Sequence, residues 1–167
     1  LIVLGDRLEI LAAVSAATCL AIPIAHIGGG QITEGAVDDS IRHAVTKLSH
    51  LHFVANSNAE RRVLQLGEES WRVHQTGSPS IDAVIGSEFP DAKSLGIDIG
   101  LDFSKPVALI TIHPETLLSE QEQATFNREV FGALSKTDCQ LLFTYPNGDP
   151  GSDEILNEIQ TMVEREG

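Results

Sequence analysis

Cysteine, aromatic residues and positive charge are all scarce in this sequence. Of its 167 residues, 2 are Cys, 5% are aromatic, and 11 are Lys or Arg against 24 that are Asp or Glu. Cys19 and Cys139 lie far apart in apolar contexts, so we predict two buried thiols and no disulfide framework. A net charge of −13 argues against binding to nucleic acid or to an anionic membrane, because both need basic patches. A small anionic ligand stays compatible, since it needs only a few local cations and a helix N-terminus.

Several familiar patterns are missing as well. The sequence has no apolar run of the ~18 residues that a membrane helix needs, no signal-peptide pattern, and no P-loop, GxGxxG or GxSxG motif. No metal-ligand spacing is present, since His50 and His52 fit the alternation of a strand better than a zinc site. These absences predict a cytoplasmic protein. The chain opens on Leu1 in an apolar run and closes in a charged helical stretch, so we expect a piece of a longer protein.

Short apolar runs alternate with helical patterns along the whole sequence. The apolar and β-rich runs predict strands at 1–4, 22–27, 52–55, 71–76, 106–112 and 139–145. Besides the central helix described below, periodicity and capping residues predict helices over 8–20, 57–66, 79–85, 119–134 and, with Ser152 as its cap, 152–165. Such alternation with short loops is typical of a parallel α/β sheet. We expect the first strand to be covered on both faces.

One segment differs from this alternation. Residues 86–105 are rich in Gly, Pro, Asp and Ser and show only weak periodicity. We therefore predict a first Rossmann-like domain over residues 1–88, a linker over 89–105, and a second Rossmann-like unit over 106–167.

The stretch from His26 to Phe53 contains the strongest indication of a ligand site. Three glycines follow the second strand and allow a sharp turn close to a ligand. A helix opens at Asp38, and its expected core stripe is Val37, Ile41, Ala44, Val45, Leu48 and Leu51. The ionisable residues beside the glycines are Glu34, Asp38, Asp39, Arg42 and His43. Any one of these charges is equally well explained by the helix dipole or by an ordinary i,i+4 ion pair such as Asp38–Arg42, but together they favour a ligand site at the carboxyl end of the sheet.

Polar residues also follow three other strands. Asp6 and Arg7 come after the first strand, where the simpler interpretation of Asp6 taken alone is a helix N-cap. His113 and Asn147 follow the two strands of the second unit. Two Rossmann-like units that face each other would place these residues around one cleft.

The motifs GDRLE, HIGGG, TEGAVDDSIRHAVTKLSHLHF, TGSP, TIHPET and YPNGD resemble those of the hydrolysing UDP-N-acetylglucosamine 2-epimerases of sialic-acid and related nonulosonic-acid biosynthesis. The resemblance covers nearly the whole chain. It implies a GT-B-like α/β fold of two Rossmann-like parallel-sheet domains, both incomplete in this chain. It also implies conversion of UDP-GlcNAc to ManNAc and UDP, by elimination of UDP and then hydration with inversion at C2, without a metal or organic cofactor.

The same resemblance suggests roles for individual residues. Asp6 and Asp38 match the acid–base positions, and carboxylates suit the removal of the proton at C2. The residues implied to bind the substrate are Arg7, Arg42, His43, Ser78, His113 and Asn147, with His113 facing the diphosphate. Family members commonly carry a carboxylate at the position of Gly28, and often another at that of Gln31. Glu34 is the residue that could replace the missing carboxylate.

The resemblance also bears on partners and on alternatives. It implies a UDP-sugar substrate and a homo-oligomer at full length, with neither nucleic acid nor a membrane as partner. A hydrolysing 2-epimerase of a UDP-diacetamido sugar is the nearest alternative. The missing carboxylate leaves open a non-catalytic nucleotide-sugar-binding module, and a GT-B glycosyltransferase is a third hypothesis.

Overall fold

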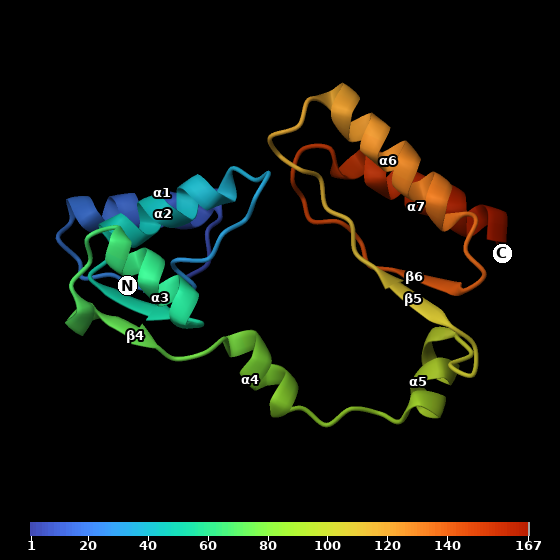
Figure 1. The fold of residues 1–167 in the computed structure, drawn as a ribbon, viewed down its shortest axis with the longest axis horizontal. Helices are drawn as coiled ribbons and strands as arrows, with labels where there is room; N and C mark the ends of the chain where they lie inside the picture. The colour runs from blue at the N-terminus through green and yellow to red at the C-terminus, as the bar shows by residue number, and fades with distance from the viewer. Residues whose placement is uncertain (167) are drawn as a thin grey trace. The chain divides into compact units, whose positions relative to one another are not determined.

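Strands and helices alternate along most of the chain that the computed structural model describes, residues 1–166 (Figure 1). The chain divides into two units, Leu1–Ser87 and a second one that begins at Glu88. The first unit contains β1 (Ile2–Leu4), α1 (Leu8–Cys19), β2 (Ala25–Ile27), α2 (Asp38–Leu48), β3 (Leu51–Val54), α3 (Ser57–Gln65), the 3-10 helix η1 (Ser70–Arg72), β4 (Val73–Gln75) and α4 (Pro79–Ile85). The second contains α5 (Ala92–Ile99), β5 (Val107–Ile110), α6 (Glu120–Leu134), β6 (Gln140–Phe143) and α7 (Ser152–Glu166).

The sheet of the first unit is parallel throughout, and its strand order β1-β2-β3-β4 follows the chain. Right-handed crossovers between consecutive neighbouring strands all put their helices on the same face. The core agrees with this rule. Val3 of β1 packs with residues of α1 and α2, which lie side by side in Figure 1, while Val54 and Val73 pack with α3. The strand register places these valines on one face of the sheet.

The opposite face of this sheet is apolar and exposed. Ile2 and Leu4 are 71% and 59% exposed, and Leu51 is 37% exposed. Phe53 and His74 stack on this face with their ring centroids 5.7 Å apart. The prediction that the first strand is covered on both faces is therefore wrong for the chain described by the structure.

The second unit repeats the one-sided arrangement on a smaller scale. Strands β5 and β6 form a parallel pair in which Ile110 lies opposite Phe143. Leu141 and Phe143 pack against Phe131 of α6 and, in the same cluster, against residues of α7. Helix α6 begins with a capping box in which the Ser119 hydroxyl and the Glu122 side chain each bind the other's backbone N–H. A parallel α/β unit was predicted here, and the structure confirms it.

Several local predictions need correction. Val37 precedes α2 and is 46% exposed, and Leu51 belongs to β3, so neither is part of the helical core stripe. Trp71 lies in η1, not in a strand, and Ser152 is the first residue of α7 and not its cap. Cys19 is exposed and Cys139 only half-buried. The thiols were placed wrongly because the apolar residues around Cys19 on α1 are mostly exposed.

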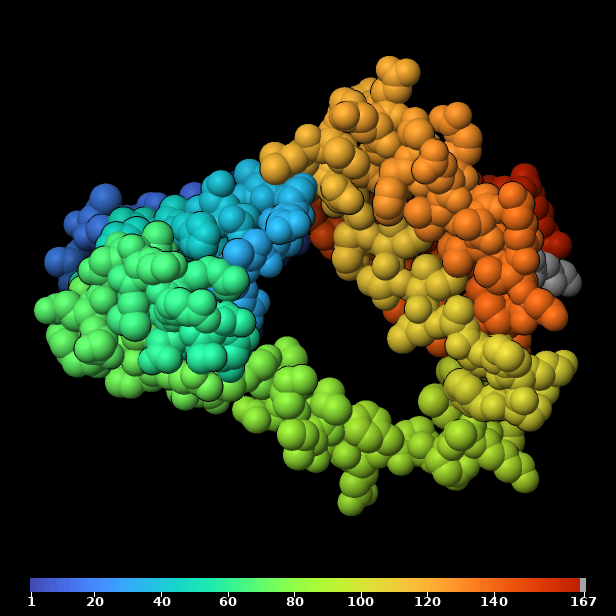
Figure 2. All heavy atoms as spheres, viewed as in Figure 1, coloured from blue at the N-terminus to red at the C-terminus, as the bar shows by residue number. Residues whose placement is uncertain are grey.

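The segment predicted as a linker contains a helix. Asp91 caps α5 by accepting hydrogen bonds from the backbone N–H groups of Lys93 and Ser94. A Cβ at Gly96 would lie 2.5 Å from the carbonyl oxygen of Leu101, so the helix packs tightly on the loop that follows it. Residues 79–95 are exposed throughout, and Figure 2 shows the chain between α4 and α5 as a narrow strip of atoms.

Two histidines are wholly buried in the first sheet, at paired positions of β2 and β3. Burial lowers the pKa of both His26 and His52. The His52 ring lies 3.2 Å from a carboxylate oxygen of Glu68, which also binds Lys47 and Arg72. Burial would raise the pKa of Glu68, but hydrogen bonds from Lys47 and His52 and the charge of Lys47 outweigh it and lower that pKa.

These shifts predict loss of stability in acid. Below pH 6.5, the ordinary pKa of histidine, the unfolded chain binds protons that buried His26 and His52 do not, so the free energy of unfolding falls with the pH. Glu68 adds a second loss of stability below pH 4.5, its ordinary pKa, because its pKa in the folded protein is lower still. We expect the Tm to fall by several degrees between about pH 7 and pH 5, and the fall to shrink in His52→Gln. Thermal unfolding of both proteins across this pH range measures the fall in Tm. An equally steep fall in His52→Gln would show that His52 does not contribute to it.

Candidate functional site

Arg42, one turn into α2, is the centre of a charged cluster. Its side chain is only 5% exposed. One guanidinium nitrogen, Nη2, binds the Asp6 carboxylate and donates to the Thr33 hydroxyl over 2.7 Å. The other, Nη1, lies 3.5 Å from Oδ1 of Asp39. Asp6 follows β1 and Thr33 follows the glycine turn, so one buried cation joins three segments that are separate in the sequence.

Asp39 ties the loop before α2 to the helix. Its Oδ1 accepts a hydrogen bond of 2.9 Å from the backbone N–H of Thr33, and its Oδ2 lies 3.6 Å from Nε2 of His43. The sequence suggested Asp38–Arg42 as an ion pair within the helix, but the residue of α2 that pairs with Arg42 is Asp39. The side chains of Asp38 and Glu34 make no hydrogen bond or ion pair within the chain described by the structure.

A cavity of about 230 Å³ lies beside this cluster, at the carboxyl ends of the four strands. Its lining residues are Leu4, Gly5, Asp6, Ile27, Gly28, Gln31, Arg42, Ala55, Gly77, Ser78, Pro79 and Ser80. Three of the residues predicted for the site, Asp6, Arg42 and Ser78, therefore line one cavity. Gly5, Gly28 and Gly77 all have positive φ, which lets the backbone form its wall.

The other residues predicted for this site lie outside the cavity. Arg7 is exposed and pairs with Glu9 over 3.5 Å. His43 keeps its Nδ1 buried without a hydrogen-bond partner among residues 1–166. Asp38, Glu34, Arg7 and His43 are thus close to the cluster in sequence but are not part of the cavity lining.

His113 and Asn147 meet in the second unit, past the ends of β5 and β6. The backbone N–H of Asn147 donates to Nδ1 of His113 over 3.1 Å. Because Nδ1 accepts, the ring proton is on Nε2, which can donate to an anionic group. The strands are also joined here by a 2.8 Å hydrogen bond between the hydroxyls of Thr111 and Thr144. This pair was predicted as a binding element, and the structure brings its two members into contact.

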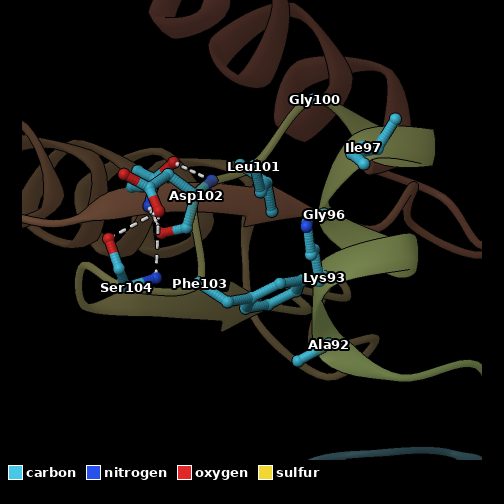
Figure 3. A pocket seen from close by; sticks show the side chains of 10 residues that line it. Ala92, Lys93, Gly96, Ile97, Gly100, Leu101, Asp102, Phe103 and Ser104 are labelled. Atoms are coloured by element: carbon cyan, nitrogen blue, oxygen red, sulfur yellow. Dashed lines mark hydrogen bonds between the residues drawn. The ribbon is translucent and has the colours of Figure 1, made fainter.

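A larger cavity of about 680 Å³ lies between α5 and the loop after it (Figure 3). Its one carboxylate, Asp102, already accepts hydrogen bonds from the backbone N–H and the hydroxyl of Ser104. The Asp102 backbone in turn pairs with the Gln140 side chain. The carboxylate of Asp102 therefore stabilises a turn. The smaller cavity, beside Asp6 and Arg42, is the better candidate for the functional site.

Two absences concern the described residues, 1–166. They contain no group of three or more His, Cys, Asp or Glu side chains arranged to hold a metal ion. None of their helices has the length and apolar character needed to cross a membrane.

Thr33 was not among the predicted site residues, and Asp39 was named only as one of the ionisable residues beside the glycines. The i,i+3 spacing of Asp39 and Arg42 is a usable signal, because residues three apart on a helix are neighbours. Nothing in the sequence indicated Thr33, whose hydroxyl reaches Arg42 only because the loop after the glycines folds back onto α2.

The chain is an α/β protein of the GT-B-like fold class, built from Rossmann-like units. A carboxylate–guanidinium cluster lies at the carboxyl edge of its first sheet. The UDP-N-acetylglucosamine 2-epimerase family model matches residues 1–166. The chain therefore belongs to the UDP-N-acetylglucosamine 2-epimerase family, in agreement with its sequence motifs.

Curated relatives and solved structures show similarity over nearly the whole chain. It is 39% identical to the GDP/UDP-N,N'-diacetylbacillosamine 2-epimerase (hydrolyzing) of Campylobacter jejuni, over 95% of this chain and 41% of the relative. It is 36% identical to the UDP-N-acetylglucosamine 2-epimerase of Neisseria meningitidis, over 93% of this chain and 40% of that protein. The chain thus spans less than half the length of these relatives. Its fold matches the N. meningitidis UDP-GlcNAc 2-epimerase bound to UDP-GlcNAc, with a TM-score of 0.73, 21% identity, and coverage of 98% of this chain and 46% of that one.

Proposed function

We propose that the full-length protein carrying this chain is a hydrolysing epimerase that converts UDP-GlcNAc and water to ManNAc and UDP. The observation that carries the proposal is the Asp6 carboxylate, which lines the cavity and is held by a buried arginine. A carboxylate fixed at a cavity wall is suited to take a proton from a weakly acidic carbon. Family membership and the name of the N. meningitidis relative support the same substrate, and the other relatives' names support 2-epimerisation of a nucleotide sugar.

The first half of the reaction is an elimination. A carboxylate takes the proton from C2 of the sugar, the C1–O bond to UDP breaks, and a C1–C2 double bond forms. Asp6 is the proposed base, because among residues 1–165 it is the one whose carboxylate lines the cavity. The charge that grows on the diphosphate needs hydrogen-bond donors, and Nε2 of His113 and the neighbouring Asn147 are proposed to supply them.

The second half adds water across the double bond. Hydroxide goes to C1, and a proton returns to C2 from the opposite face, which gives the inverted sugar. Asp38 is the proposed second acid–base group, because its carboxylate has no partner within residues 1–166 and lies on the helix that carries Arg42. Glu34, equally unpartnered there, is the alternative for this step, while Arg7, His43 and Ser78 are proposed to contact the substrate.

Product analysis in D₂O tests the proposal. The full-length protein is incubated with UDP-GlcNAc and, separately, with UDP-N,N'-diacetylbacillosamine. We expect release of UDP and a 2-epimerised sugar with deuterium at C2. The second substrate is included because the similar C. jejuni protein is named for the diacetamido sugar. UDP release without deuterium at C2 would contradict epimerisation, tight binding without turnover would favour the binding module, and transfer to an acceptor would favour a glycosyltransferase.

Four finer expectations belong to the same proposal. The product is proposed to enter nonulosonic-acid biosynthesis, which is supported by 34% identity to the polysialic acid biosynthesis protein P7 of Escherichia coli. A cytoplasmic location and a homo-oligomeric state stay predictions from the sequence. The net charge of −13 supports the expectation that neither nucleic acid nor an anionic membrane is a partner.

A further inference from the structure

The imidazole of His26 spans the two halves of the charged cluster. The ring is wholly buried in β2. Its Nε2 lies 2.9 Å from the carbonyl oxygen of Gly5, the residue just before Asp6. Its Nδ1 lies 3.1 Å from the hydroxyl of Thr46, which is one helical turn after Arg42 and lies 2.9 Å from the Arg42 carbonyl oxygen. One side chain thus contacts both the segment that carries the carboxylate and the helix that carries its guanidinium partner.

The hydrogen-bonding capacity of these groups fixes the tautomer. A carbonyl oxygen only accepts, so Nε2 must carry a proton and donate it to Gly5. Burial lowers the pKa of His26, which keeps the ring neutral near pH 7. Nδ1 is therefore an acceptor, and it shares the single proton of the Thr46 hydroxyl with the Arg42 carbonyl oxygen, to which that hydroxyl also donates. Each ring nitrogen thus has a partner within hydrogen-bond distance.

The glycine turn rests on the same contact. A Cβ added at Gly29 would lie 3.0 Å from the Thr46 hydroxyl oxygen and 3.2 Å from Nδ1 of His26. The turn that forms part of the cavity wall therefore packs directly against the histidine–threonine pair. One buried ring thus contacts the Asp6 segment and α2, and the glycine turn packs against it.

We propose that His26 is a positioning residue, which sets the separation of Asp6 and Arg42 by hydrogen-bonding the Gly5 carbonyl with Nε2 and the Thr46 hydroxyl with Nδ1. The consequence for turnover rests on the proposed epimerase function. Small displacements of a reacting group are costly, and a shift of about 1 Å can lower a rate by about 10²-fold.

A buried histidine can also be an ordinary core residue, and the chain offers a matched comparison. His52 lies opposite His26 in the neighbouring strand and is equally buried. Its Nε2 contacts Glu68, whose other partners are Lys47 and Arg72, and not the segment of Asp6. Loss of His52 should therefore cost stability without moving the carboxylate.

The experiment compares His26→Asn, His26→Gln and His52→Gln in the full-length protein. An Asn amide reaches the position of Nδ1 but loses the bond to Gly5, whereas a Gln amide reaches the position of Nε2 and can keep it. We expect kcat for UDP release to fall by about 10²-fold in His26→Asn, with KM changed less than about threefold. We expect kcat of His26→Gln to be about tenfold or more above that of His26→Asn. We expect kcat of His52→Gln to stay within about twofold of wild type.

Backbone hydrogen exchange provides a readout that needs no turnover. The backbone amides of Asp6 and Arg7 should exchange faster in His26→Asn than in His52→Gln. Both variants are measured at the same number of degrees below their own Tm, so that a difference in overall stability does not enter the comparison. Equal exchange and an equal loss of kcat in His26→Asn and His52→Gln would overturn the proposal, since His26 would then be a core residue only. If wild type releases no UDP, the proposed function fails, and the exchange rates alone still decide whether His26 positions Asp6.

Discussion

Replacement of Asp6 by asparagine in the full-length protein is expected to lower kcat for UDP release by about 10³-fold, within the range for removal of a general base. An amide cannot take the proton from C2, although it has nearly the same size and can still accept a hydrogen bond from Arg42. KM should change little, because the group acts on the reacting carbon more than on binding. Steady-state UDP release and deuterium incorporation at C2 measure both effects.

The fold should survive this substitution. Arg42 loses one charged partner, but Asp39 and Thr33 still bind its guanidinium. Because the Asp6 side chain is 23% exposed and its amide replacement keeps one hydrogen bond, we expect a cost of about 1–2 kcal/mol, below the 3–5 typical of breaking a fully buried pair.

Glu9→Gln is the matched control for Asp6→Asn. It makes the same chemical change three residues after Asp6, in the first turn of α1, on a side chain that is 75% exposed and does not line the cavity. Wild-type kcat is expected for it. An Asp6→Asn variant that retains more than a tenth of the wild-type kcat would remove Asp6 from the role of base.

The order of strands and helices was predictable because it depends on local patterns. Apolar runs such as Leu1–Leu4 and capping residues such as Asn56 act within a few residues of where they stand. The helix over Pro79–Ile85 was predicted at its observed bounds, since proline is favoured in a first helical turn. Helices and strands that depend on neighbouring residues in the chain could thus be predicted from the sequence.

What the sequence could not supply depends on packing between distant segments. The i,i+4 rule favours Asp38–Arg42, but Arg42 turns instead toward Asp6 and Thr33, and this brings it within reach of Asp39. Which face of β1 is exposed depends on the handedness and order of the crossovers, which place all the connecting helices on the other side. The existence of a charged site was therefore predictable, but the identity of its ion pair was not.

Gly30→Ala is expected to have the largest effect on stability. Gly30 has φ +76°, and a Cβ there would lie 2.2 Å from the backbone carbonyl oxygen of Ala59, which cannot move without shifting α3. The Gly30 carbonyl also accepts a 2.9 Å hydrogen bond from Arg62, which fixes the loop against that helix. The left-handed conformation costs alanine about 1–2 kcal/mol and the overlap about 1–3 kcal/mol more, so we expect a loss of about 2–5 kcal/mol or failure to fold.

Gly67→Ala separates the two causes, because Gly67 has φ +89° but no atom within 4 Å of the position of a Cβ. It should lose only the conformational part, about 1–2 kcal/mol. Urea unfolding of the two variants and of wild type, in the full-length protein, gives the difference directly. Equal losses would mean that the loop moves away from α3 at no cost. In that case the glycine turn is not rigidly packed, and the cavity wall beside Asp6 adapts to its ligand instead of being formed in advance.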